Sequence, residues 1–79
     1  MDTNTAHTFA SKNRHAIENS SNCACFYCKQ SFLSAEVSEW VDAGQTAICP
    51  KCGIDAVLGD DQPVELTPEF IREMNLAWF

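Results

Sequence analysis

The amino-acid sequence predicts a small α+β domain, with a short β hairpin between two cysteine turns and a helix packed across it. Three observations lead to this prediction. Two Cys-x-x-Cys pairs occupy positions 25–28 and 49–52, the segment between them has the pattern of strand, turn and strand, and an amphipathic segment follows. The chain has 79 residues, enough for one domain whose core is marginal without a cross-link or a metal ion.

The first residues of the chain are expected to form a flexible lead, from 1 to 10, because they are polar and rich in Thr and Asn. The remaining residues, 11–79, then make a single domain. A short helix capped by Ser11 is expected to run to about Asn19, with Ala16 and Ile17 as its apolar contacts. Residues 20–22 end this helix and lead to the first cysteine turn.

The cysteines of the two turns are predicted to bind one metal ion. Cys25, Cys28, Cys49 and Cys52 offer four thiolates, which is the ligand set of a tetrahedral structural zinc site. Four protein ligands leave no open position on zinc, so the ion would contribute folding energy instead of catalysis, and the ion-free chain should be largely unfolded. Iron suits the same thiolates and is the second choice of metal. The motif therefore predicts a zinc-ribbon-like fold.

A fifth cysteine, Cys23, leaves three roles open. It can substitute for Cys25, because the run Cys-x-Cys-x-x-Cys offers three sulfurs to two coordination positions. It can act as a reactive thiol whose pKa the nearby ion lowers. It can also pack as a small apolar residue beside the turn. The odd number of cysteines argues against a closed disulfide framework.

The segment 34–42 fits a strand or a helix from its apolar spacing alone. We prefer a strand, because Asp42-Ala43-Gly44-Gln45 is a turn signal and the β-prone Thr46-Ala47-Ile48 follows it. After the second cysteine turn, residues 54–58 are expected to form a short helical turn that Gly59 stops. Residues 60–63 are expected to form a loop.

The clearest helix in the sequence begins after Thr67, which is a good N-cap, and Pro68 suits the first helical position. Phe70, Met74 and Trp78 follow at i, i+4 and i+8 and are expected to pack across the ribbon. The closing Trp78-Phe79 pair either docks back onto the domain or offers an apolar patch to a partner.

Several separate motifs between residues 15 and 79 form one pattern: Cys23-Ala24-Cys25-Phe26-Tyr27-Cys28, Glu36 to Trp40, Asp42-x-Gly44-x-Thr46-Ala47, Cys49-Pro50-x-Cys52-Gly53-Ile54-Asp55, and Phe70, Met74 and Trp78-Phe79. This pattern resembles a family of small bacterial proteins described only as cytoplasmic proteins of unknown function. The resemblance implies a cytoplasmic, zinc-ribbon-like protein and brings no activity or substrate. The segment between Gly59 and Pro63 is shorter here than that family leads us to expect. Such short proteins also occur in phage genomes, so both a bacterial and a phage origin are open.

The charge of the chain favours some classes of partner over others. Eleven acidic and five basic residues give a net charge of −6, which disfavours binding to a phosphate backbone. The polar start and the lack of a long apolar run predict no signal peptide and no membrane span, and hence a cytoplasmic location. His7 and His15 have no catalytic partner at a local spacing, so we expect exposed histidines and no enzyme activity.

These observations lead us to expect a non-enzymatic zinc-binding adaptor or regulator that recognises another protein. The residues expected on its partner surface are Tyr27, Lys29, Trp40, Lys51 and Phe79. Two alternatives remain: a nucleic-acid-binding zinc ribbon that uses the basic and aromatic residues of the cysteine turns, and a thiol redox or metal sensor that uses Cys23. A homo-oligomer is also open.

Overall fold

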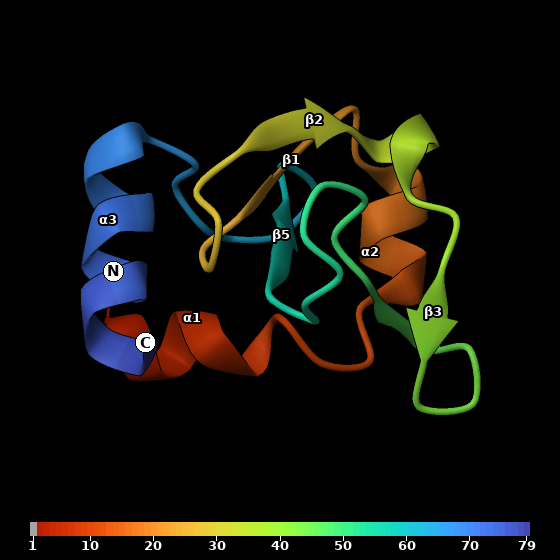
Figure 1. Ribbon diagram of the computed structural model, residues 1–79, viewed down its shortest axis with the longest axis horizontal. Coiled ribbons are helices and arrows are strands. Elements are labelled where there is room, and N and C mark those ends of the chain that lie inside the picture. Colours follow the sequence, from red (N-terminus) through yellow and green to blue (C-terminus); the bar gives the residue numbers. More distant parts are fainter. Residues whose placement is uncertain (1) are drawn as a thin grey trace.

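The computed structural model describes residues 2–79 and is shown in Figure 1. Its helices are α1 (Thr3–Thr8), α2 (Arg14–Asn19), the short 3-10 helix η1 (Ser34–Glu36) and α3 (Pro68–Trp78). Its strands are β1 (Asn22–Cys25), β2 (Ser31–Leu33), β3 (Trp40–Val41), β4 (Thr46–Ala47) and β5 (Val57–Gly59). In Figure 1, α1 and α3 lie together at one end of the molecule, α2 and β3 lie at the other end, and β5 lies between them.

The central element is a three-stranded antiparallel sheet with strand order β2-β1-β5. This sheet was not predicted from the sequence, and the helical turn predicted for residues 54–58 is wrong. Leu58 pairs with Ala24 in the sheet, and all three residues of β5 are buried. A short apolar run that is buried on both faces shows no period that separates strand from helix. Gly59 is the last residue of this strand, where it pairs with Cys23. A side chain is not accommodated at this position, because a Cβ there would collide with the Ser20 hydroxyl.

The predicted hairpin is present, but it is shorter than expected. The strands β3 and β4 form two residue pairs, Trp40 with Ala47 and Val41 with Thr46. The preceding residues 34–36 form η1 and only residues 40 and 41 form β3, so a strand over the whole of 34–42 is wrong. The Glu36 carboxylate accepts a hydrogen bond from the Leu33 N–H at 2.8 Å and thereby holds the chain in this tight turn.

The N-terminal segment is helical, whereas its composition predicted a flexible lead. Residues 3–8 form α1, capped by the Asp2 side chain, and Ala6 is fully buried. The Phe9 carbonyl accepts hydrogen bonds from the Asn13 and Gln62 side-chain amides at 3.1 and 2.7 Å. Tertiary contacts, which local composition does not reveal, therefore order this polar segment.

The second helix ends at Asn19 as expected, and its Ile17 is buried, but it begins at Arg14 instead of after Ser11. The residue that precedes it, Asn13, is 4% exposed, and its side chain forms hydrogen bonds with two strands. Its Nδ2 donates to the Val57 carbonyl at 2.9 Å, and its Oδ1 accepts from the Ala47 N–H at 3.1 Å. Asn13 thus joins the link between α1 and α2 to both β4 and β5.

The C-terminal helix confirms the predicted start, since the Thr67 hydroxyl accepts from the Phe70 N–H at 3.2 Å and Pro68 is its first residue. Phe70, Ile71 and Met74 are buried. Trp78 docks against α1: its ring stacks on His7 with a centroid distance of 3.8 Å, and its Nε1 donates to the Thr3 carbonyl at 3.2 Å. His15 is exposed as expected, whereas His7 is half-buried by this stack.

No helix in the part of the chain that the structure describes is both long and apolar enough to cross a membrane.

Candidate metal centre

The two cysteine turns, which we call knuckle 1 (residues 25–30) and knuckle 2 (residues 49–54), repeat the same backbone hydrogen bonds. In knuckle 1, Lys29 N–H donates to the Cys25 carbonyl at 2.8 Å, and Cys25 N–H donates to the Gln30 carbonyl at 3.0 Å. In knuckle 2, the equivalent bonds run from Gly53 to Cys49 at 2.9 Å and from Cys49 to Ile54 at 2.9 Å. The same local fold thus presents the cysteines of each pair in the same way.

Each knuckle is closed by a residue in the left-handed region of backbone conformation. Gly53 has φ of +81°, a conformation that glycine adopts without strain because it has no Cβ. The equivalent residue of knuckle 1 is Lys29, with φ of +64°. A residue with a Cβ is disfavoured in this region by about 1–2 kcal/mol. Knuckle 1 therefore carries strain that knuckle 2 does not.

The four sulfurs converge at the point where the knuckles face each other. The Sγ atoms of Cys25 and Cys52 are 3.7 Å apart, those of Cys28 and Cys49 are 3.8 Å apart, and all four lie within 4.8 Å of one another. A disulfide would place two sulfurs about 2.0 Å apart, so these are free thiols. A tetrahedron with zinc–sulfur bonds of about 2.3 Å has edges of about 3.8 Å. The four cysteines can therefore hold a metal ion.

Backbone amides support this arrangement from within each knuckle. Tyr27 N–H donates to the Cys25 sulfur at 3.3 Å, and Lys51 N–H donates to the Cys49 sulfur at 3.3 Å. These bonds favour the thiolate form of cysteine, which a metal ion requires.

Burial divides the four thiols into two kinds. Cys25 and Cys49 are buried, whereas Cys28 and Cys52 are partly exposed. Burial raises the pKa of the Cys25 and Cys49 thiols, although the neighbouring backbone N–H groups lower it. Cys28 is desolvated less, and this raising effect is outweighed by hydrogen bonds from Gln30 N–H and the neighbouring sulfurs, so its pKa is lowered. An ion that binds all four sulfurs would therefore displace protons from the buried thiols.

Cys23 lies outside the group of four. It sits in β1 opposite Phe32 and Gly59, and it is 1% exposed. Burial, assisted by the negative charge of Asp60, raises the pKa of its thiol to about 11. This placement matches the packing role among the three that the sequence left open, and it gives no support to a substitute ligand or an accessible reactive thiol.

The five residues expected on a partner surface do not share one face. The Tyr27 and Phe79 rings meet edge to face at 4.7 Å and remain 45% and 59% exposed. Trp40 lies in β3, at the opposite end of the molecule from the C-terminus in Figure 1. Its ring packs under the Arg14 guanidinium at 4.5 Å. Trp40 is therefore engaged within the fold, far from the other two aromatic rings.

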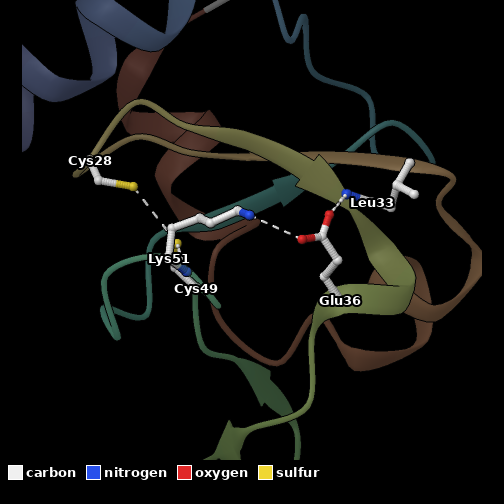
Figure 2. Close-up of polar contacts among 5 residues, drawn as sticks. All are labelled: Cys28, Leu33, Glu36, Cys49 and Lys51. Atoms are coloured by element: carbon white, nitrogen blue, oxygen red, sulfur yellow. Dashed lines mark hydrogen bonds and ion pairs between the residues drawn. The ribbon is translucent and has the colours of Figure 1, made fainter.

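The two lysines of the predicted surface differ in their surroundings. Lys51 pairs with Glu36 at 3.1 Å, and Figure 2 shows its side chain extending from beside Cys49 toward that carboxylate. Lys29 is exposed on knuckle 1. Phe26 is 1% exposed and cannot stack on a base. The basic and aromatic face proposed for a nucleic acid is thus reduced mainly to Lys29 and Tyr27.

Asn75, a residue not predicted from the sequence, connects α3 to the metal centre. Asn75 Nδ2 donates to the Phe26 carbonyl at 3.1 Å and to the Tyr27 carbonyl at 2.9 Å. The Phe79 ring packs on the same knuckle, with its centroid 5.8 Å from that of the Phe26 ring. In the sequence, Asn75 is marked only by following Met74, a residue of the apolar stripe. This position alone does not predict its contact with knuckle 1.

Comparisons of the chain with protein-family models, curated proteins and solved structures give no match. The family resemblance therefore rests on the sequence motifs alone.

Proposed function

We propose that this protein is a non-enzymatic zinc-binding protein of zinc-ribbon type that acts as an adaptor or regulator by recognising another protein. The observation that supports zinc is the sulfur geometry, because the 3.7 and 3.8 Å separations match the edge of a zinc–thiolate tetrahedron. Four cysteines fill the coordination sphere of zinc, so the ion stabilises the fold and leaves no position for a reacting water.

The adaptor role is supported by the exposed apolar side chains near knuckle 1. Tyr27, Leu76, Trp78 and Phe79 are all more than a third exposed; Tyr27 belongs to knuckle 1, Leu76 and Trp78 belong to α3, and Phe79 follows α3 directly. A net charge of −6 favours a protein partner over a phosphate backbone. Exposed apolar groups gathered near one element are typical of a protein interaction site.

The zinc assignment is tested on protein purified without chelators. Elemental analysis should return about one zinc per chain, as one four-ligand site requires. Cys28→Ser should lose most of this zinc, whereas the control Cys23→Ala should keep it, because Cys23 lies outside the group of four. Wild-type protein without near-stoichiometric metal would contradict the metal site. Near-stoichiometric iron in place of zinc would show that the site binds iron.

The same zinc-loaded protein then serves as bait for a protein partner. We expect a partner that binds the wild type, is lost with Tyr27→Ala, and is retained with Leu33→Ala, a 56% exposed residue on β2. The adaptor role is contradicted if the zinc-loaded wild type captures no protein above the bare resin.

A further inference from the structure

The two knuckles have the same backbone hydrogen bonds, but only knuckle 1 accepts hydrogen bonds from a side chain of α3. Knuckle 1 holds α3, since the single Asn75 amide group bridges two of its successive carbonyls. Within residues 2–79, no side chain donates in this way to the Pro50 or Lys51 carbonyls of knuckle 2. The metal centre is therefore joined to the C-terminal helix through one knuckle.

The bridge made by Asn75 depends on the shape of knuckle 1. Its two acceptors, the Phe26 and Tyr27 carbonyls, belong to the peptide units between Cys25 and Cys28. One NH₂ group reaches both oxygens only while these peptide units keep their present orientation, and sulfur atoms bound to a common ion on either side would fix that orientation.

Without an ion, knuckle 1 is the weaker of the two turns. Lys29 must hold φ of +64°, which is disfavoured for a residue with a Cβ, whereas Gly53 takes the equivalent position of knuckle 2 freely. Loss of the ion would therefore let knuckle 1 relax first, and relaxation would separate the two carbonyls that Asn75 bridges.

The C-terminal helix also carries α1 with it. Trp78 stacks on His7 at 3.8 Å and donates to the Thr3 carbonyl, while Phe79 packs on Tyr27 of knuckle 1. By contrast, β1 supplies only its last residue, Cys25, to the four-cysteine group, and its other pairs with β5, at Cys23 and Ala24, rest on backbone bonds away from that group. Asn13 ties β5 to β4 without contacting the sulfurs. The contacts of the sheet thus depend less on the ion than those of α3.

From these contacts we infer that ion binding by the four cysteines is coupled to docking of α3, with Asn75 and knuckle 1 as the link. Loss of the ion releases α3, and exposes its apolar face of Phe70, Ile71 and Met74, before the three-stranded sheet opens. The inference rests on the proposed metal site, and it makes the exposure of that face a consequence of ion loss. Asn75 acts as a positioning residue in this scheme, because it touches the backbone of the knuckle and no sulfur.

Thermodynamic reciprocity gives the sharpest test of this coupling. If the ion favours docking of α3, docking must favour the ion by the same factor, typically about 5- to 150-fold. Asn75→Ala should therefore weaken Zn²⁺ binding by that factor, measured by competition with a chelator, although the side chain contacts no ligand atom. Leu76→Ala, at the next position and 77% exposed, should leave the affinity unchanged.

Hydrogen exchange of the wild-type protein supplies a second measurement that needs no variant. After Zn²⁺ is withdrawn, the amides of residues 71–79 should lose protection before those of β1 and β5. Simultaneous loss in both regions would overturn the coupling, and so would equal Zn²⁺ affinity of wild type and folded Asn75→Ala. A wild type that binds no ion would instead overturn the metal site and the coupling together.

Discussion

At the scale of single residues, Lys29 and Gly53 have the same left-handed backbone conformation, but only Lys29 has a Cβ. Gly53→Ala should lower the free energy of unfolding by about 1–2 kcal/mol, the cost of the left-handed region. A Cβ at Gly53 meets nothing within 4 Å, so this cost is conformational. Lys29→Gly should remove the equivalent strain and raise stability by up to about 1 kcal/mol, since glycine also loses more entropy on folding.

Urea unfolding of the zinc-loaded variants measures both effects. Opposite signs for the two substitutions would support the matched conformations of the knuckles. Destabilisation by Lys29→Gly would show that the Lys29 side chain contributes more than its backbone strain costs.

The residues of the site were predictable to the extent that spacing alone determines them. Two Cys-x-x-Cys pairs identify Cys25, Cys28, Cys49 and Cys52, because each knuckle forms locally and both pairs need a common centre. Asn75 was not predictable, since its acceptors lie far away in the sequence. The same holds for Arg14, whose stacking on Trp40 depends on how α2 meets the hairpin.

At the scale of elements, α3 and the hairpin were predicted because their signals are local. Thr67 and Pro68 mark a helix start, and residues 42–45 mark a turn. The pairing of β5 with β1 was missed because the two strands are distant in the sequence and β5 is a short, fully buried run. The helix α1 was missed for a similar reason. The Asn13 and Gln62 side chains, which lie outside the helix, donate hydrogen bonds to the Phe9 carbonyl at its C-terminal end.

Asn13 is the side chain on which several of these elements meet, so its removal tests how they are joined. Asn13→Ala should lower the free energy of unfolding by about 2–4 kcal/mol, because the Ala47 N–H and the Val57 carbonyl lose their partner in the buried interior. Denaturant unfolding measures the change. The matched control is Asn19→Ala, an exposed asparagine that should alter stability by about 0.5 kcal/mol or less. Equal effects of the two variants would contradict the joining role.

At the scale of the whole molecule, a small core and a four-cysteine centre should make stability depend on both zinc and pH. Burial raises the pKa of Cys25 and Cys49, so these thiols are protonated at neutral pH unless an ion displaces their protons. Unfolding of the zinc-loaded protein then releases the ion, and the freed thiols take up protons below their ordinary pKa of about 8.5. The unfolded state therefore binds more protons than the native state in this range.

Stability must rise with pH wherever the unfolded state binds more protons. The Tm of the zinc-loaded protein, measured at a fixed free zinc concentration, should accordingly increase from about pH 6 to about pH 8 and level off near the ordinary cysteine pKa. The Cys23→Ala variant should show the same increase, because Cys23 lies outside the four-cysteine group and ion binding does not remove the proton of its thiol. A Tm that stays constant or falls across this range would mean that thiolate coordination does not hold the fold together.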